Sequence, residues 1–145
     1  MTSDLAALEV PGPTATPLTE PFWEAAAEGR LLLQRCGACG RAVFYPRAIC
    51  PHCWRDALVW EEASGAGRLK SFSQVWKPGH PGWIAATPYL VGLVELREGP
   101  TMLSHLLARL DDVVIGTPLR FVPADVGGRF LPCFETVQGK GKNNG

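Results

Sequence analysis

Residues 35–54 read Arg35-Cys-Gly-Ala-Cys-Gly-Arg-Ala-Val-Phe-Tyr-Pro-Arg-Ala-Ile-Cys-Pro-His-Cys-Trp54 and contain two Cys-x-x-Cys pairs, which are separated by ten residues. Each Cys-x-x-Cys turn directs two thiolates to one point, and four thiolates at tetrahedral corners are the ligand set that Zn²⁺ prefers. The spacing therefore predicts a zinc site whose ligands are Cys36, Cys39, Cys50 and Cys53. Because protein atoms fill all four positions, we expect a structural ion and no open coordination site for catalysis.

A redox role is the alternative for the two Cys-x-x-Cys pairs. A thioredoxin-type site places one such pair at the N-terminus of a helix within a βαβ unit. The segments on either side of residues 36–53 show no such pattern, so zinc is the preferred interpretation. A ribbon of this size has little core of its own, and metal binding then supplies much of its folding free energy.

The segments next to the cysteines predict the rest of a small ribbon unit. Residues 31–35 and 58–61 are short apolar runs that suit strands before and after the two pairs. Upstream, residues 21–28 suit a short helix, because Pro21 fits its first turn and Gly29 ends it. We expect residues 21–62 to form a helix plus zinc ribbon. We expect the preceding residues 1–20 to form a flexible arm. Residues 3–9 suit a helical turn or two, and Pro11, Pro13 and Pro17 then predict an extended segment that cannot bury itself and is either disordered or lies on another protein.

The second half of the chain predicts a β-barrel. Strand signals occur at residues 68–77, 89–96, 102–107, 119–122 and 129–137. The run at 89–96 is almost entirely apolar and predicts a strand that is buried on both faces, whereas 77–83 is rich in Pro and Gly and predicts a loop. Gly127-Gly128 has the composition of a hairpin turn. Five strands of this length suit a small closed barrel such as an OB-fold over residues 63–138, followed by a flexible tail at 139–145.

Composition limits the classes of function. The chain has 145 residues, 46% hydrophobic and 19% charged, with a formal net charge of zero. Residues 30–70 carry seven bases against three acids, so an anionic ligand or partner could bind there, but the whole chain lacks the basic excess of nucleic-acid binders. No apolar run approaches the roughly 20 residues that cross a bilayer, and the acidic N-terminus does not resemble a secretory signal. We therefore expect a cytoplasmic protein.

The remaining reactive side chains form no complete active site. Cys133 lies in a predicted strand without a nearby base and suits a buried core position. His52 is interpreted as an exposed spacer within the second Cys-x-x-Cys pair, and His105 as a half-buried strand residue. His80 and Trp83 share the loop after the first long strand, where barrel proteins often bind ligands, and are candidate contacts for a partner or ligand.

Several motifs, in this order, resemble the DUF35 family over roughly residues 20–137. They are Pro21-Phe-Trp23, Glu28-Gly29-Arg30-Leu31, CxxCG, Pro46-Arg47, CPxCW, Gly65-Ala-Gly67, Val94-Glu-Leu96 and Ile115-Gly116-Thr117-Pro118-Leu119. The resemblance implies a mainly β protein with an N-terminal helical arm, a rubredoxin-like zinc ribbon and a five-stranded OB-fold barrel. It also implies an acyl-CoA-associated, non-catalytic accessory subunit that docks on a thiolase-like catalytic chain and helps shape its CoA-thioester site. The catalytic residues would then belong to the other chain.

The resemblance leaves the catalytic partner and its substrate open. The partner could be a thiolase, an acyltransferase or an aldolase, and a hot-dog-fold enoyl-CoA hydratase is the nearest alternative. The substrate would be an aromatic, steroid or other bulky acyl-CoA. The arginines of the ribbon, Arg41 and Arg47 among them, could bind CoA phosphates or could form a solvated face. A single-stranded nucleic-acid module is the alternative from a different class, because zinc ribbons and OB-folds both bind single strands. An independent enzyme has no supporting residues.

Overall fold

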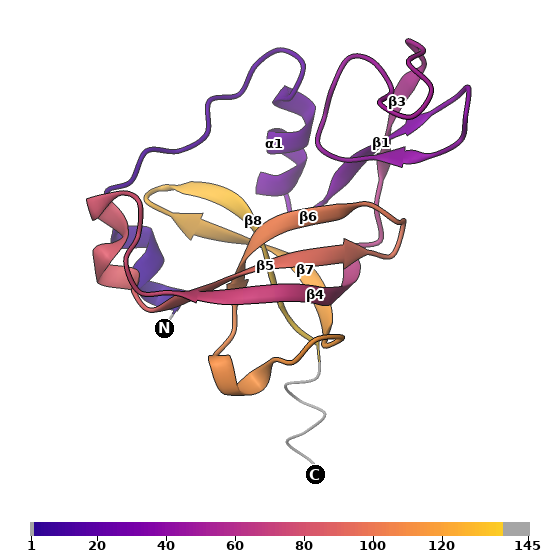
Figure 1. Ribbon diagram of the computed structural model, residues 1–145. Coiled ribbons are helices and arrows are strands. Elements are labelled where there is room, and N and C mark those ends of the chain that lie inside the picture. Colours follow the sequence, from indigo (N-terminus) through magenta and orange to yellow (C-terminus); the bar gives the residue numbers. More distant parts are fainter. Residues whose placement is uncertain (1, 138–145) are drawn as a thin grey trace.

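A computed structural model describes residues 2–137 and shows a three-stranded ribbon joined to a closed five-stranded barrel (Figure 1). The predicted tail at 139–145 lies outside the described residues. The ribbon contains β1 (Leu32–Cys36), β2 (Ala42–Val43) and β3 (Leu58–Glu62) in the order β2-β1-β3. The barrel contains β4 (Ala66–Val75), β5 (Tyr89–Leu96), β6 (Thr101–Leu107), β7 (Pro118–Val126) and β8 (Arg129–Thr136) in the order β4-β5-β6-β8-β7, with β7 pairing back to β4. The mainly β fold is therefore confirmed.

One helix packs against both sheets. The helix α1 (Glu20–Ala27) has Pro21 in its first turn and is followed by Gly29 at φ +88°, a left-handed conformation that glycine adopts without steric cost. Its buried face includes Phe22, which is 1% exposed and joins Leu31 and Phe134 in one hydrophobic cluster. The core therefore runs without a break from the helix and ribbon into the barrel, and burial of this shared cluster stabilises their relative placement.

Two features of the barrel agree with the sequence, and one differs. The two-residue hairpin loop Gly127-Gly128 has φ angles of +64° and +94°, and the β7–β8 register places Val126 opposite Arg129. The strand β5 matches the predicted bounds. Its burial alternates, however, and Leu93 is 38% exposed, so the prediction that both faces of this strand are buried is wrong. The face that points into the barrel is buried, whereas the other face is half-buried at Tyr89 and Val91 and exposed at Leu93 and Glu95.

The N-terminal arm packs on the barrel of its own chain. The short 3₁₀ helix η1 (Thr2–Ala7) is followed by an extended segment, and Leu5 and Leu8 are both buried. They pack in a cluster with Val126, and the backbone N–H of Gly127 donates to Leu5 O at 3.0 Å. The predicted helical turn therefore packs on the β7–β8 hairpin, which provides an apolar surface for it, whereas Pro11, Pro13 and Pro17 in the extended segment are exposed.

The loop between β4 and β5 contains a second 3₁₀ helix, η2 (Pro81–Ala86), which the Pro- and Gly-rich composition did not predict. A third 3₁₀ turn, η3 (Leu110–Asp112), follows β6. In Figure 1 the helix η2 and the N-terminus lie at one side of the barrel, and the ribbon extends from the other side. No helix within residues 2–137 is long and apolar enough to cross a membrane.

Candidate metal centre

The two cysteine pairs form matching knuckles with the same backbone hydrogen bonds. In the first, the N–H of Gly40 donates to Cys36 O at 2.8 Å, and the N–H of Cys36 donates to Arg41 O at 3.0 Å. In the second, the N–H of Trp54 donates to Cys50 O at 2.8 Å, and the N–H of Cys50 donates to Arg55 O at 3.1 Å. This repeated turn explains why both pairs direct their sulfurs toward one point.

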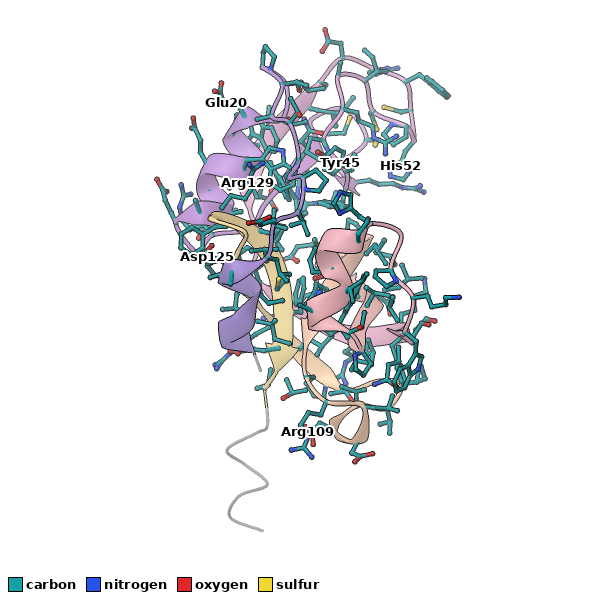
Figure 2. The ribbon with its side chains drawn as sticks, turned by 90° about the vertical axis from the view of Figure 1, so that its left-hand side faces the viewer. Glu20, Tyr45, His52, Arg109, Asp125 and Arg129 are labelled. Carbon is teal, nitrogen blue, oxygen red and sulfur yellow. The ribbon has the colours of Figure 1, made fainter. Side chains whose placement is uncertain are left out.

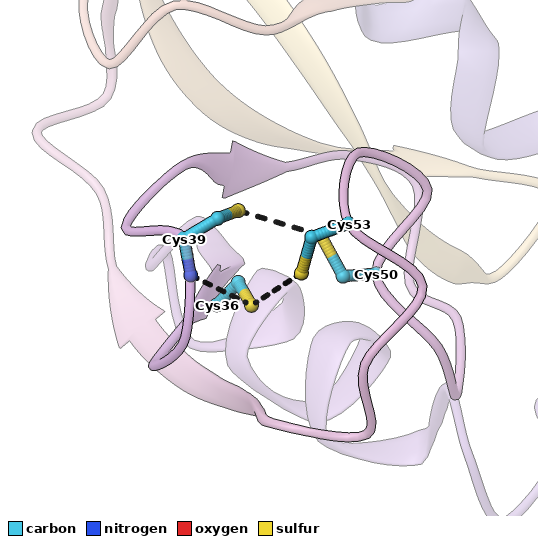
Figure 3. Close-up of side chains that lie close together, drawn as sticks. All are labelled: Cys36, Cys39, Cys50 and Cys53. Carbon is cyan, nitrogen blue, oxygen red and sulfur yellow. Dashed lines mark hydrogen bonds between the residues drawn. The ribbon is translucent and has the colours of Figure 1, made fainter.

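The four sulfurs lie at distances suited to one zinc ion (Figure 3). Cys36 Sγ lies 3.6 Å from Cys53 Sγ, Cys39 Sγ lies 3.7 Å from Cys50 Sγ, and all four sulfurs lie within 4.8 Å of one another. Sulfurs bound at about 2.3 Å to a tetrahedral zinc ion stand about 3.8 Å apart. The residues therefore fit a structural Zn²⁺ site, and all four corners are taken by protein ligands.

Backbone N–H groups prepare the sulfurs for metal binding. The N–H groups of Cys39 and Ala38 donate to Cys36 Sγ at 3.4 and 3.3 Å, and they lower the pKa of the Cys36 thiol to about 6. The N–H of Arg55 favours the thiolate of Cys53, but burial and the neighbouring thiols outweigh it and raise the pKa of Cys53 to about 11. A divalent cation at the centre removes this conflict, because it stabilises all four sulfurs as thiolates.

Arg35 connects the knuckle to the ribbon sheet. Its Nε and Nη2 donate to the two carboxylate oxygens of Glu61 at 2.7 and 3.0 Å, and its Nη1 donates to Gly40 O at 2.7 Å. The hydrogen bonds from Arg35 hold the pKa of the Glu61 carboxyl below its ordinary value. The bidentate pair fixes the guanidinium on β3, and the third bond then positions the turn that carries Cys39.

The two ribbon arginines predicted as contacts lie on the surface in different settings. Arg41 is exposed, its Nη1 lies 3.3 Å from His52 Nδ1, and both residues line a cavity of about 450 Å³ between the ribbon and the β5–β6 turn. Arg47 is held through its backbone, because its N–H donates to the Gln34 side chain at 2.8 Å and its carbonyl accepts from it at 3.0 Å. Its side chain is exposed, as a solvated face or a binding face would both require.

Of the other predicted pair, His80 is the N-cap of η2 and Trp83 lies on this helix, and neither residue lines the ribbon cavity. His80 Nδ1 accepts from the N–H of Gly82 at 2.9 Å and caps this helix. Trp83 is half-buried, with its ring centroid 5.2 Å from Tyr89 and 5.8 Å from His105. The structure therefore does not bring the four predicted contact residues together at one site. Figure 2 shows the labelled His52 in the ribbon and Arg109 at the opposite end of the molecule.

Sequence reasoning missed the aromatic groove beside Trp83. Tyr89 and His105 stack with centroids 5.2 Å apart, and a cavity of about 440 Å³ beside them is also lined by Trp23 and Leu103. Burial lowers the pKa of His105 below its ordinary value. The groove depends on the register of β5 and β6, which places Val91 opposite His105. Residue types alone do not show that register, so the sequence could not predict the groove.

The lone cysteine and the spacer histidine lie where the sequence predicts. Cys133 is completely buried in β8, and burial raises the pKa of its thiol to about 12. Such a thiol stays protonated and unreactive at neutral pH. His52 is exposed, and its N–H donates to Cys50 Sγ at 3.3 Å. His52 is therefore not needed as a zinc ligand, because the four cysteine sulfurs already fill the site.

Family models match both halves of this fold. Residues 23–59 match "ChsH2, rubredoxin-like zinc ribbon domain", and residues 60–123 match "ChsH2, C-terminal OB-fold domain". The matched boundary lies within β3, at the end of the ribbon. The cysteine cluster and the closed barrel thus correspond to the two parts that the family models describe.

Two of the curated relatives carry names of CoA-enzyme subunits. A probable enoyl-CoA hydratase alpha subunit from Thermomonospora curvata is 39% identical over 102 residues, which are 68% of this chain and 31% of the relative. The benzoylsuccinyl-CoA thiolase subunit BbsA from Thauera aromatica is 35% identical over 86 residues, which are 57% of this chain and 58% of the relative. The chain thus spans less than two thirds of the length of either protein.

A solved structure matches over nearly its whole length. It is named Ltp2-ChsH2(DUF35) aldolase, and the matched chain is 32% identical with a TM-score of 0.75. The alignment covers 86% of this chain and 98% of that chain. With the ribbon and barrel each matching a ChsH2 family model, the chain belongs to the DUF35 family.

Proposed function

We propose that this protein is a non-catalytic accessory subunit of a thiolase-type acyl-CoA enzyme. The observation that carries the proposal is the similarity to the matched chain of a structure named Ltp2-ChsH2(DUF35) aldolase. The alignment covers 98% of that chain. The likeness to a benzoylsuccinyl-CoA thiolase subunit supports the same class of partner. The zinc holds the ribbon in shape, and the catalytic residues are supplied by the partner chain. Its substrate is a bulky acyl-CoA, and the complex acts in the cytoplasm.

Arg41 and the cavity beside it are the proposed contact with CoA. CoA carries phosphates, and a guanidinium binds phosphate oxygens through charge-assisted hydrogen bonds. Arg41 and His52 line the cavity of about 450 Å³, and Arg41 makes none of the ion pairs found within residues 2–137. Arg47 adds a second exposed cation on the ribbon. Trp83 belongs to the separate aromatic groove, where it would contact the acyl group or the partner chain.

Co-purification tests the partner, and turnover tests the role. The tagged protein is recovered from its native host, and the bound chain is identified by mass spectrometry. We expect a thiolase-like chain in stoichiometric amount, and acyl-CoA turnover that requires both chains. Turnover by the isolated protein on a panel of acyl-CoAs would contradict the accessory role. An Arg41→Gln variant that keeps the complex but raises the KM for acyl-CoA would support the proposed phosphate contact.

A hot-dog-fold enoyl-CoA hydratase is the second candidate partner. The observation that favours it is the 39% identity to a probable enoyl-CoA hydratase alpha subunit, of which the alignment covers 31%. The same co-purification separates the two candidates, because the partner would be a hydratase chain and the complex would add water to an enoyl-CoA. Zinc and a bound single-stranded nucleic acid, without any enzyme chain, would contradict both.

A further inference from the structure

Trp54 occupies a backbone position that the ribbon otherwise gives to glycine. It follows Cys53 as Gly40 follows Cys39, and each donates its N–H to the carbonyl of the first cysteine of its own knuckle at 2.8 Å. Gly40 has φ +80° and Trp54 has φ +66°, and Trp54 is the one non-glycine residue with positive φ in the described range 2–137. A side chain with a Cβ is destabilised in this left-handed conformation.

The cost of this conformation is not recovered within the chain. The Trp54 side chain is 78% exposed, so it buries little apolar surface. It also takes part in none of the ring contacts found within residues 2–137. A residue that strains the backbone and leaves a large indole in water does not stabilise the isolated fold. Strain of this kind is typical of binding sites, where a partner supplies the missing contacts.

The charges of the ribbon define the kind of partner. Between Cys36 and Trp60 the ribbon has three arginines, all exposed, against the single acid Asp56. Arg55 follows Trp54 directly in the sequence. Arg41 Nη1 lies 3.3 Å from Nδ1 of His52, which belongs to the same knuckle as Trp54. None of the three arginines makes an ion pair within the described residues. The complementary surface is therefore an apolar pocket with acidic side chains at its rim.

We propose that Trp54 is the anchor by which the zinc ribbon docks on the catalytic partner chain, its indole filling an apolar pocket with an acidic rim. The inference rests on the proposed function and adds to it the docking residue and the chemistry of the opposing surface. Tryptophan and arginine are enriched among the residues that dominate binding energy at protein interfaces. The rigid zinc knuckle holds the indole in its bound position before contact, which reduces the entropic cost of association.

A small ligand is a poorer match for Trp54 than a protein. Small molecules bind in concave sites that enclose most of their surface. The cavity beside the ribbon is lined by Arg41, Phe44 and His52 but not by Trp54. An indole that projects from the ribbon instead inserts into a concavity on the other molecule. Bases of single-stranded nucleic acid also stack on exposed aromatic side chains, so oligonucleotide binding is measured as well.

The test uses two Trp54 variants that the backbone tolerates, the charge reversal Arg55→Glu and one matched control. Trp54→Gly gives the second knuckle the residue of the first, and Trp54→Asn uses a side chain that accepts the left-handed conformation. Trp76→Ala removes another exposed tryptophan, 67% exposed, at the end of β4 and outside the ribbon. Each full-length protein is measured for zinc content, for Tm, and for Kd with the thiolase-like chain recovered by co-purification.

We expect Trp54→Gly to keep its zinc, to have a Tm equal to or above that of the wild type, and to bind about 30-fold more weakly, a loss of about 2 kcal/mol. Trp76→Ala should bind within threefold of the wild type. Arg55→Glu should weaken binding most at low salt. This combination of a stable fold and lost binding would not arise if Trp54 were merely structural.

The opposite results overturn the inference. A loss of less than tenfold for both Trp54 variants contradicts an anchoring role, and failure of both to fold contradicts the claim that Trp54 serves no structural purpose. Binding of a single-stranded dT oligonucleotide that weakens tenfold in Trp54→Gly would assign the indole to nucleic acid instead. If the wild-type protein binds no thiolase-like chain at all, the proposed function fails rather than the choice of residue.

Discussion

Replacing Gly92 with alanine should destabilise the barrel, because this glycine lies where three neighbours approach the backbone of β5. A Cβ at this position would lie 2.8 Å from Leu106 Cδ1, 2.9 Å from Leu69 Cδ1 and 3.0 Å from Ser71 O. Real Cβ contacts are rarely shorter than 3.4 Å. The leucine methyls can rotate away, but the Ser71 carbonyl belongs to β4, where the β4–β5 register shifts between Leu69 and Ser71.

The expected net cost of Gly92→Ala is about 1.3 kcal/mol. Overpacking a filled core costs roughly 1–3 kcal/mol, and the lower chain entropy of alanine in the unfolded state offsets about 0.4–1 kcal/mol of it. For a chain of this size about 1.3 kcal/mol corresponds to a decrease in Tm of about 3–5 °C. Thermal unfolding followed by circular dichroism measures it directly.

Gly79→Ala is the matched control. Its Cβ would have no neighbour within 4 Å, and its φ lies outside the left-handed region. The same substitution there should leave Tm unchanged or raise it slightly. If Gly92→Ala proves as neutral as Gly79→Ala, the close approach of β4 and β5 in the barrel interior is refuted.

Three further predictions concern the metal, the pH dependence and the arm. Cys39→Ser should lose the zinc and the protection of the β1–β3 amides from exchange, whereas Cys133→Ala should keep one zinc per chain. Metal analysis measures the zinc and hydrogen exchange measures the protection. Zinc retained by Cys39→Ser would contradict the site. Burial lowers the pKa of His105, so as the pH falls the unfolded chain binds a proton at this residue before the folded chain does. Stability should therefore rise with pH up to about 6.5 and stay level above it. His105→Gln should flatten this dependence of Tm on pH. Leu8→Ala should speed proteolysis within residues 9–19, while exposed Leu18→Ala should not, since only Leu8 is buried against the barrel; equal cleavage rates would argue against a docked arm.

The parts of the fold that the sequence predicted are set by local chemistry. The spacing of the cysteine pairs determines which sulfurs can share one ion, and Gly127-Gly128 supplies the two positive φ angles that its hairpin turn needs. Pro21 and Gly29 mark the ends of α1 to within one or two residues. In each case the neighbours in sequence are also the neighbours that decide the structure.

The features that escaped prediction depend on distant partners. Residues 3–9 predict a helical turn, but the burial of Leu5 and Leu8 depends on the apolar surface that the β7–β8 hairpin supplies. The two-residue strand β2 exists only because β1 pairs with it. Trp54 looks like an ordinary aromatic beside a cysteine, and its strain becomes visible only from its φ angle. Sequence patterns report burial and turns, but they do not report which surfaces meet.

The most direct test of the account is the mass of the intact assembly. Native mass spectrometry of the co-purified complex counts both the catalytic chain and the metal in one measurement. We predict one zinc ion on each copy of this protein, bound stoichiometrically to a thiolase-like chain. A zinc-loaded protein that stays alone in the presence of that chain would contradict the account.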